Sequence, residues 1–322
     1  MRRELRQKIL LLKVNLLSLL KYKKSNKNVA ILSSKKWQNK VTDDILLRKE
    51  LLKNNINAKI ITFEEPQNYK EFDLVIVRSI WGYEKDIANF EKFLNRLSKN
   101  NISVLNDIAI IKNNYDKEKQ FNLLEKYKIP HIKTIFIPKN SKNIASQVQE
   151  NLNGEMILKP SMSASGNNTY LINCEEDRKN TLPLEEINKK FEGINKSTSL
   201  MLQPFIKEID EGEISLIYIG GKFSHAIKRF PSVFNNKKGV SYISNIDKEL
   251  FTLGEKVLKI KEYQGALYER IDVIKINNEY LVMELELVEP DFFIRYISKK
   301  EVKKYILKNL VKAIKEKMEE LK

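Results

Sequence analysis

Residues 268–290 constrain the fold of this chain more than any other stretch. Two apolar segments joined by two asparagines carry charged side chains where a fully buried hairpin would have none. The apolar residues fall mainly on one face of each predicted strand, and the charged residues fall on the other. The charged residues are Arg270, Asp272, Glu284 and Glu286. The stretch therefore predicts an antiparallel hairpin that is buried on one face and presents three carboxylates and one guanidinium on the other.

The length of the connecting loop decides which of these charges meet. A two-residue turn of Asn277 and Asn278 would put the acids of the two strands on opposite faces. A three-residue loop, Asn277–Glu279, brings the apolar faces of both strands together, and the sequence favours it for that reason. This loop gives the cross-strand pairs Arg270–Glu286, Ile271–Leu285, Asp272–Glu284 and Val273–Met283.

Three carboxylates this close repel one another unless a cation lies among them. The oxygen-only ligand set of Asp272, Glu284 and Glu286 suits Mg²⁺, which usually shares its coordination shell with phosphate. Glu284 and Glu286 are about 6.6 Å apart on a strand that rises about 3.3 Å per residue. Glu286 is thus placed to bridge two ions about 3.5–4 Å apart. The alternative is a solvated strand face with an Arg270–Glu286 ion pair, and the hairpin alone leaves both open.

The composition and the net charge limit the kinds of protein that this sequence can encode. The chain has 322 residues, 42% of them hydrophobic, which predicts a globular protein with two or three subdomains. Its net charge of +16 comes from lysines spread along the whole sequence, without the interleaved aromatics of a nucleic-acid surface. One cysteine (Cys174) and two histidines (His131 and His225) exclude internal disulfides, thiolate zinc clusters and histidine-rich metal sites. We expect no nucleic-acid partner and a reducing, cytoplasmic location.

Residues 1–27 form a basic, leucine-rich segment. Its apolar run is too short and too polar to span a bilayer, and it lacks the cleavage site of a signal peptide. We expect no stable membrane insertion. Two alternatives remain: an amphipathic helix on a membrane surface, or a helix docked on the body or on a second subunit of a homodimer. The sequence favours the docked helix.

Residues 28–112 alternate predicted strands and helices, which indicates a parallel sheet. The expected strands are 29–32, 58–62, 74–77 and 103–105, and the expected helices are 41–54 and 87–97. Ligands of such sheets lie beyond the carboxyl ends of the strands, where Arg78 follows the third strand with Trp81 and Tyr83 beside it. An arginine backed by aromatics suits a substrate carboxylate, although an ordinary surface loop is nearly as good an interpretation.

Residues 113–195 contain two candidate phosphate contacts. Asp116 is a predicted helix N-cap, and Lys117 lies in the first turn, where a lysine gains nothing from the helix dipole. A bound phosphate would explain this lysine, as would the general abundance of lysine. A strand at 155–158 then ends in Lys159 and leads into the small polar loop Ser161–Asn168, which includes Ser165 and Gly166. Small residues leave backbone N–H groups free to cradle phosphate.

Residues 196–322 begin with a strand at 199–203, followed by Pro204, Phe205 and Ile206. A Gly220-Gly221 turn then predicts a hairpin. Its simple two-residue register gives the pairs Glu213–Lys228, Ile214–Ile227, Leu216–His225 and Tyr218–Phe223. This register makes His225 a core residue rather than a base. The periodicity of 299–322 predicts a closing amphipathic helix.

The order of these pieces resembles the ATP-grasp superfamily over roughly residues 74–292. The pieces are Asp116-Lys117, Lys159-Pro160 with its Ser/Gly loop, Gln203-Pro204-Phe205, Gly212-Glu213, Arg270-x-Asp272 and Glu284-x-Glu286. The resemblance is to the glutathione synthetase-like branch, nearest to the cyclo-ligases of cycloserine biosynthesis. It implies a mixed α/β and α+β fold, with a parallel α/β pre-ATP-grasp domain (28–112) before two ATP-grasp subdomains (113–195 and 196–322).

The resemblance also implies roles for residues. Lys117 and Lys159 would contact ATP, the loop with Ser165 and Gly166 would close over the phosphates, and Gln203, Pro204, Phe205 and Ile206 would form the adenine hinge. Glu213 would serve the ribose or hold Lys228, which is expected to be catalytic together with Arg270. Asp272, Glu284 and Glu286 would bind two Mg²⁺ ions, with Mn²⁺ as a substitute. Many relatives have Asn in place of Glu286, and most have more glycines in the phosphate loop.

The implied reaction is ATP-dependent, ADP-forming ligation through an acyl phosphate, in which a small-molecule carboxylate is joined to an amine or another nucleophile. Such chemistry needs positioning and charge neutralisation rather than a protein nucleophile. Two alternatives stay open from the sequence. One is an ATP-grasp ligase that modifies a peptide, and the other is a basic nucleic-acid-binding protein.

Overall fold

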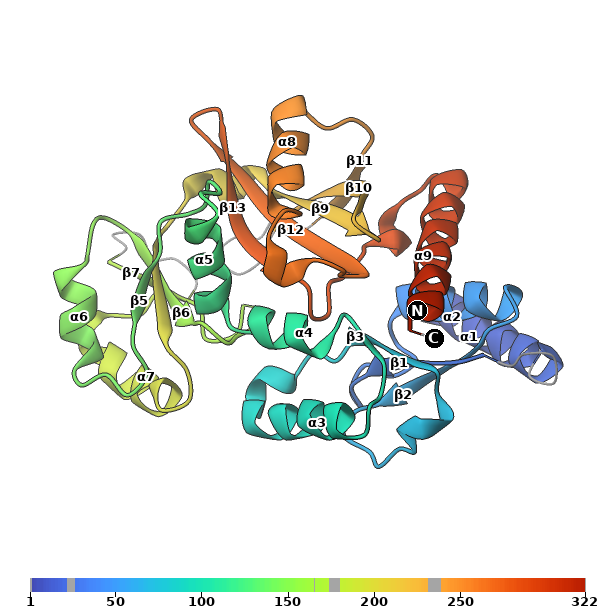
Figure 1. Cartoon of the computed structure of the whole chain (residues 1–322). Helices are drawn as coiled ribbons and strands as arrows, with labels where there is room; N and C mark the ends of the chain where they lie inside the picture. Colours follow the sequence, from blue (N-terminus) through green and yellow to red (C-terminus); the bar gives the residue numbers. More distant parts are fainter. Residues whose placement is uncertain (1, 22–26, 165, 174–179, 231–238, 322) are drawn as a thin grey trace.

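The computed structural model describes residues 2–21, 27–164, 166–173, 180–230 and 239–321. Three separate sheets organise them, one parallel and two antiparallel. Figure 1 shows the three sheets as separate lobes, joined by α4 (Ile108–Asn114) and α5 (Lys117–Lys126). The predicted combination of a parallel α/β domain with a two-subdomain α+β fold is confirmed.

The N-terminal sheet is entirely parallel, with the strand order β2-β1-β3-β4. Its helices cover both faces because successive buried side chains of a strand point to opposite sides. Ile31 of β1 packs with α2 and Leu32 packs with α3. The elements are β1 (Asn28–Ser33), α2 (Thr42–Lys53), β2 (Asn57–Thr62), β3 (Leu74–Ser79), α3 (Ile87–Lys99) and β4 (Val104–Leu105).

The basic segment at the N-terminus forms α1 (Arg2–Lys21), which packs against α2. Val14 is fully buried in this contact, and Leu10, Leu11 and Leu17 are partly buried beside it. The prediction of a helix docked on the body is therefore correct. None of the helices in the described residues combines the length and apolar character that a membrane span requires.

The central sheet is antiparallel, with the order β5-β8-β6-β7. Two helices pack on it through Val148 and Phe191. The last strand, β8, pairs with β5 and β6, so it completes this sheet although the sequence places it after the expected boundary at residue 195. The elements are β5 (Ile135–Ile137), α6 (Ile144–Glu150), β6 (Met156–Pro160), β7 (Tyr170–Ile172), α7 (Ile187–Asn195) and β8 (Leu200–Pro204).

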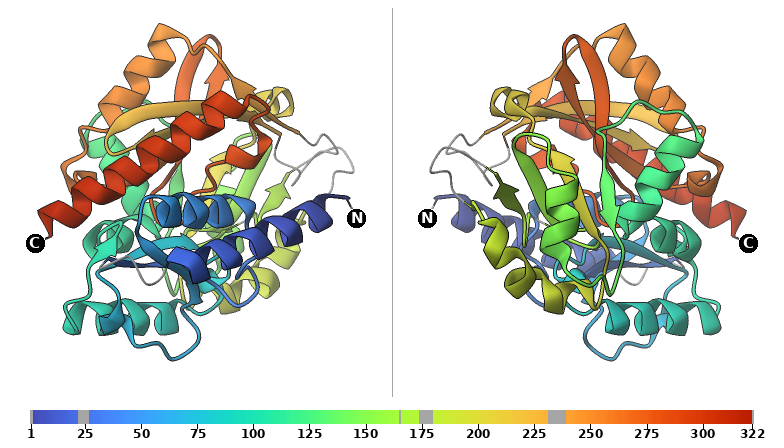
Figure 2. Two further views of the ribbon diagram at one scale, coloured as in Figure 1. Left: turned by 90° about the vertical axis from the view of Figure 1, so that its right-hand side faces the viewer. Right: turned by 90° about the vertical axis from the view of Figure 1, so that its left-hand side faces the viewer.

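The C-terminal sheet has five antiparallel strands in the order β11-β10-β9-β12-β13. One face packs on α5 and α8, and α9 joins the other face to the core around α2. Figure 2 shows α9 running past this sheet on the side toward α1 and α2. The elements are β9 (Glu213–Ile219), β10 (Lys222–Arg229), β11 (Val240–Ile243), α8 (Lys248–Val257), β12 (Tyr268–Ile276), β13 (Glu279–Glu286) and α9 (Lys300–Glu320).

The hairpin β12–β13 has most of the predicted residue pairs, but its turn length and its register differ from the prediction. Its turn has two residues, Asn277 and Asn278, both at positive φ, and not the three that we expected. A register shift between Asp272 and Val273 then restores the pairing, so Val273 lies opposite Val282 and the predicted Val273–Met283 pair is wrong. Beyond the shift the predicted pairs are correct: Arg270–Glu286, Ile271–Leu285 and Asp272–Glu284.

The hairpin β9–β10 also contains a register shift, between Phe223 and His225. The shift invalidates the predicted pairing beyond the Gly220-Gly221 turn, except for Tyr218–Phe223. The structure pairs His225 with Ile217, Ala226 with Leu216, Ile227 with Ser215, Lys228 with Ile214 and Arg229 with Glu213. His225 is nevertheless a core residue, as predicted, and its Nε2 is 2.7 Å from the carbonyl oxygen of Phe292.

Candidate active site

A cavity of about 820 Å³ lies where the three sheets meet. Its volume falls within the range of ligand sites, about 300–1,000 Å³. Side chains from all three lobes line it, which makes it the natural place for a ligand held between subdomains. The lining includes Glu4, Gln7, Trp37, Lys40, Trp81, Lys117, Lys159, Gly166, Gln203, Pro204, Phe205, Ile206, Glu213, Arg229, Arg270, Asp272, Met283, Glu284, Glu286, Glu289, Asp291 and Arg295.

Two lysines mark one part of the cavity. Lys117 follows its N-cap Asp116 at the start of α5, and its Nζ donates to the carbonyl oxygen of Ser163 and lies 3.3 Å from Glu284. Lys159 comes from β6, and burial lowers its pKa to about 8. Gly166 lines the cavity, whereas Ser165 is outside the described residues. The predicted phosphate contacts thus lie together with one predicted metal ligand.

The predicted adenine hinge follows the end of β8 and lines the same cavity through Gln203, Pro204, Phe205 and Ile206. The Gln203 amide donates to the hydroxyl of Thr134 at 2.8 Å. The backbone N–H of Phe205 is already used, because it donates to the carbonyl oxygen of Glu155. Apolar side chains accompany the hinge, which suits the faces of a base; they are Ile132, Ile157, Ile209 and Met283.

Asp272 is the centre of a buried cluster of charges. It lies 2.7 Å from Arg229 and 3.0 Å from Arg270, and it accepts a hydrogen bond from Ser215. Burial alone would raise the pKa of Asp272, but the two guanidinium groups outweigh it and lower this pKa to about 2. Asp272 is therefore a carboxylate whose charge is already balanced by two arginines.

The second arginine of this cluster is Arg229, which also takes the place across from Glu213 that the sequence analysis gave to Lys228. Arg229 lies 2.7 Å from Glu213 as well as from Asp272. The register shift in β10 explains the difference, because it turns Arg229 to the cavity, and Lys228 does not line the cavity in the described part of the chain. Burial raises the pKa of Glu213 to about 7, although Arg229 acts to lower it.

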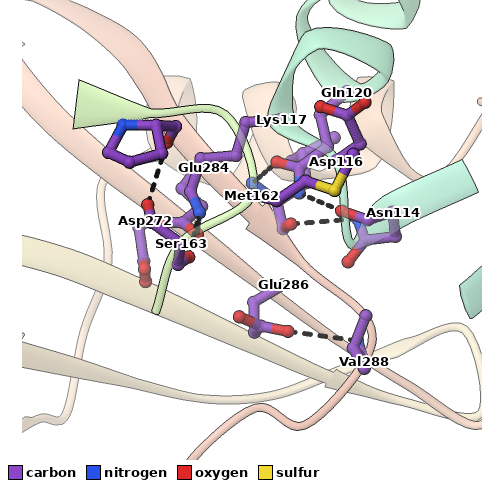
Figure 3. Close-up of polar contacts among 12 residues, drawn as sticks. Asn114, Asp116, Lys117, Gln120, Met162, Ser163, Asp272, Glu284, Glu286 and Val288 are labelled. Carbon is purple, nitrogen blue, oxygen red and sulfur yellow. Dashed lines mark hydrogen bonds and ion pairs between the residues drawn. The ribbon is translucent and has the colours of Figure 1, made fainter. Parts of the chain in front are cut away.

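Glu284 and Glu286 project into the cavity from β13 (Figure 3). Glu284 faces Lys117. The carboxylate of Glu286 accepts the backbone N–H groups of Val288 and Glu289, at 3.1 and 3.2 Å. Burial raises the pKa of Glu286. A cation from outside the chain would favour its charged form.

These acids fit a metal shared with phosphate better than a metal cage made of protein alone. No cluster of three or more acidic, histidine or cysteine side chains in the described residues is arranged to hold a metal ion. Mg²⁺ usually takes only one or two carboxylates and completes its shell with water and substrate phosphates. Glu284 and Glu286 provide such a pair beside the two lysines, whereas Asp272 is held by its arginines.

Two side chains that the sequence analysis missed hold β13 at its outer edge. Asn114 donates to the carbonyl oxygen of Leu285 at 3.0 Å and accepts the N–H of Leu287 at 2.8 Å. Gln120 accepts the N–H of Leu285 at 3.1 Å. Figure 3 shows both beside the strand. They replace the neighbouring strand that an edge strand lacks, and thereby fix the backbone on both sides of Glu286.

Glu289 is a further acid that the sequence analysis missed. It lines the cavity, its side chain is 2% exposed, and its Oε2 has no hydrogen-bond partner among the described residues. The other acids in this part of the cavity have partners: Glu213 and Asp272 contact Arg229, Glu284 contacts Lys117, and Asp291 contacts Arg295. The only sequence signal was the position of Glu289, three residues beyond Glu286.

The predicted substrate contacts are only partly at the cavity. Arg78 is 3% exposed, lies 3.3 Å from Asp44 and stacks 3.7 Å from the ring centroid of Phe292. Arg78 does not line the cavity in the described part of the chain, although its buried Nη1 has no hydrogen-bond partner there. A contact between Arg78 and the substrate therefore stays a prediction. Tyr83 is also buried, against Phe90. Trp81 does line the cavity, edge-on to Trp37 at a centroid distance of 5.4 Å.

A different arginine, Arg295, lines the cavity. It lies 2.5 Å from Asp291 and 3.2 Å from Asp43, and Asp43 also accepts the backbone N–H groups of Ile294 and Arg295. Burial raises the pKa of Asp43 to about 7, against the lowering effect of Arg295. This cluster ties α2 of the first domain to the segment after β13.

Comparison with known proteins agrees with this geometry. A family model described as "D-cycloserine synthetase DcsG, N-terminal domain" matches residues 29–106. No curated protein matches the sequence. The structure is similar to a crystal structure of D-cycloserine synthetase DcsG, with a TM-score of 0.76 and 17% identity over 92% of this chain and 100% of that one.

Two further solved structures share the fold. D-alanine--D-alanine ligase from Bacillus anthracis, complexed with ATP, has a TM-score of 0.66 and 14% identity over 92% of this chain and 98% of that one. The ATP-grasp ligase PsnB, complexed with a phosphomimetic variant of its minimal precursor, Mg and ADP, has a TM-score of 0.57 and 12% identity over 90% and 99%. The family model "Prokaryotic glutathione synthetase, ATP-grasp domain" matches residues 123–300, more than half of the chain. The chain is therefore an ATP-grasp ligase that belongs to this glutathione synthetase family.

Proposed function

We propose that this ligase activates the carboxylate of a small molecule or amino-acid derivative as an acyl phosphate, with release of ADP, and joins it to an amine. The observation that carries the proposal is that one cavity is lined by two chemically different groups of side chains. The same cavity is lined by Lys117, Lys159 and the Glu284–Glu286 pair from the two ATP-grasp subdomains and by Trp37 and Trp81 from the N-terminal domain. ATP and a second, smaller ligand would thus meet in a single cavity.

The first step needs charge balance at the transferred phosphoryl group. A carboxylate oxygen of the substrate attacks the γ-phosphorus, and the bond to the bridging oxygen of ADP breaks. Lys117 and Lys159 would neutralise the phosphates, and Arg270 and Arg229, which line the same cavity, would stabilise the transferred group. Glu284 and Glu286 would hold Mg²⁺, which supplies additional positive charge at the phosphates. We propose that two ions would be held there, with Mn²⁺ as a substitute.

The second step joins the two substrates. The amine nitrogen attacks the carbonyl carbon, the bond to the phosphate oxygen breaks, and the amine loses a proton as inorganic phosphate leaves. Glu289 lies in the cavity wall, and its Oε2 has no hydrogen-bond partner among the described residues, which would suit the amino group of the substrate. Trp37 and Trp81 would enclose the body of the substrate and exclude water.

A peptide-modifying ligase is the second candidate. It is favoured by the similarity to PsnB, whose solved complexes contain a minimal precursor, and by the fact that Glu4 and Gln7 of α1 line the cavity. In both candidates the nucleotide part of the reaction is the same, and only the size of the carboxylate substrate differs.

A substrate screen tests the proposal. ADP release would be measured with Mg-ATP and single amino acids, amino-acid derivatives and short acidic peptides, each with and without an added amine. We expect release above background with at least one small carboxylate, and Glu286→Gln as the matched control should remove it. Release only with peptides would favour the second candidate. Binding of Mg-ATP without ADP release for any carboxylate would contradict the proposed reaction.

A further inference from the structure

Helix α1 has two apolar faces, and the described residues cover only one of them. The inner face packs on α2 through Val14. The outer face carries large apolar side chains that are 44% to 77% exposed. Nine large apolar side chains are exposed in the described residues, and five of them lie on this one helix, so the stripe is not ordinary scatter. The stripe consists of Leu5, Ile9, Leu12, Leu16 and Leu19.

The spacing of the stripe is that of a coiled-coil seam. Its members are separated by four, three, four and three residues, which is the alternation that keeps one line of side chains facing a partner helix. In heptad terms Leu5, Leu12 and Leu19 occupy d positions, and Ile9 and Leu16 occupy a positions. The inner face does not require this pattern, because it makes its contacts with α2 through other residues.

The residues beside the stripe select the charge of the partner. Among the residues of α1 whose exposure the structure describes, the e positions are Arg6 and Lys13 and the g positions are Lys8 and Asn15, and all four are exposed. Asn15 is held by a hydrogen bond from Arg48, so the flanks combine neutral and positive groups. Two copies of this helix would set like charges against each other, whereas a helix with acidic flanks would complement them.

The shape of the stripe separates a helical partner from a membrane surface. A seam confined to a and d positions is narrower than the apolar face by which helices usually insert into a membrane interface. The helix has no aromatic residue between Arg2 and Lys21, although aromatic anchors are common in membrane-surface helices. A second helix laid along the seam would bury the whole stripe.

The stripe also lies outside the parts of the chain that define the family. The matches to the two family models begin at residue 29, after α1. In the left view of Figure 2, α1 runs across the face turned to the viewer. Its first turns nevertheless reach the active-site cavity, because Glu4 and Gln7 line it and Gln7 donates to the carbonyl oxygen of Lys40. A partner bound along α1 would thus end beside the substrate part of the cavity.

We propose that the exposed stripe of α1 is a docking surface for an acidic amphipathic helix of a partner polypeptide. The proposal does not depend on the identity of the ligase substrate, because it rests on the seam and on its basic flanks. The contact would combine burial of the leucines with ion pairs to Arg6, Lys8 and Lys13.

The test uses the full chain and two synthetic helical peptides of about three heptads with leucine at a and d. One peptide has glutamate at e and g, and the other has lysine. We expect the acidic peptide to bind at least about tenfold more tightly in fluorescence anisotropy, a difference of about 1.4 kcal/mol. The double variant Leu12→Gln/Leu16→Gln should weaken binding about a hundredfold. Tyr305→Gln, an equally exposed apolar residue of α9, is the matched control and should leave binding unchanged.

A charge reversal makes the test specific. The variant Lys8→Glu/Lys13→Glu should prefer the lysine peptide, because the flanks then carry the opposite sign. Three outcomes would overturn the proposal. The first is binding to anionic phosphatidylglycerol vesicles but not to the acidic peptide. The second is a wild-type dimer in sedimentation that Leu12→Gln/Leu16→Gln dissociates. The third is that the protein binds both peptides with equal affinity or binds neither peptide. ADP release by the double variant, assayed without peptide, should equal that of wild type, so that loss of docking is distinguished from loss of the ligase.

Discussion

Arg229 lies 2.7 Å from Asp272 and balances a carboxylate that the neighbouring residue, Lys228, does not reach. The same guanidinium contacts Glu213 at 2.7 Å, so one side chain joins two buried acids of adjacent strands. Arg270 approaches Asp272 from the other side. Both arginines line the cavity, where the phosphoryl group would be transferred.

Replacement of Arg229 should therefore impair the reaction far more than replacement of Lys228. We expect Arg229→Ala to lower the rate of ADP release by about 10²–10³, the usual loss for one electrostatic donor at a transition state. Lys228→Ala is the matched control and should stay within about twofold of wild type, because Lys228 does not line the cavity in the described structure. Arg229→Lys keeps the charge without the two-pronged geometry and should lie between them. A normal rate for Arg229→Ala together with an inactive Lys228→Ala would contradict the assignment.

The wrong Glu213–Lys228 pair shows what the sequence can predict and what it cannot. Alternation along a strand predicts which residues share a face, and the Gly220-Gly221 turn predicts the hairpin correctly. A β-bulge leaves no such signal, because one extra residue changes the pairing of everything beyond it while the composition stays the same. The register shift at Ser224 therefore placed Arg229, and not Lys228, across from Glu213.

In the hairpin β12–β13 the sequence analysis missed both the length of the turn and the bulge, and their effects on the strand register cancel. The turn is shorter than expected by one residue, and the bulge adds one, so Asp272 still meets Glu284. Other parts of the site depend on contacts between segments far apart in the sequence. Arg78 was predicted from its place at a strand end, but Asp44 of α2 and Phe292 enclose it. Periodicity within one segment carries no information on such partners.

Replacement of Glu286 tests the metal assignment. Glu286→Gln keeps the shape of the side chain and still accepts the N–H groups of Val288 and Glu289. Because burial raises the pKa of Glu286, removal of its charge should hold or raise the melting temperature without nucleotide. The rate of ADP release should fall by about 10²–10³. If Glu286 only formed a surface ion pair, the variant would lose at most about 1 kcal/mol of stability and turn over normally.

Asn114 should couple the stability of β13 to the affinity for nucleotide. Asn114→Ala leaves the carbonyl oxygen of Leu285 and the N–H of Leu287 without their partner, and we expect a loss of about 2–4 kcal/mol in the free energy of unfolding. The KM for Mg-ATP should rise, because Glu284 and Glu286 lie on the loosened strand. Asn113→Ala, the neighbouring residue of α4, is the control for helix propensity. Equal effects of the two substitutions on KM would show that Asn114 does not position the strand.

Glu269 gives a prediction on the dependence of stability on pH, away from the cavity. Its side chain is 4% exposed in β12, and burial raises its pKa to about 8 from an ordinary value of 4.5. The folded state therefore keeps a proton that the unfolded state releases, so this group favours folding below about pH 4.5 and its contribution is lost as the pH rises toward 8. At pH 7 the difference amounts to about 3 kcal/mol, at about 1.4 kcal/mol per pKa unit.

Glu269→Gln removes this titration while it keeps the size of the neutral side chain. The variant should match wild type near pH 4 and exceed it in free energy of unfolding by up to about 3 kcal/mol at pH 7. Urea unfolding of both proteins between pH 4 and 8 measures the difference, in which the other titrating groups cancel. Glu279→Gln, at an exposed position of β13, controls for the loss of one carboxylate. A difference between Glu269→Gln and wild type that stays constant over this range would mean that Glu269 is ionised in the folded protein at neutral pH.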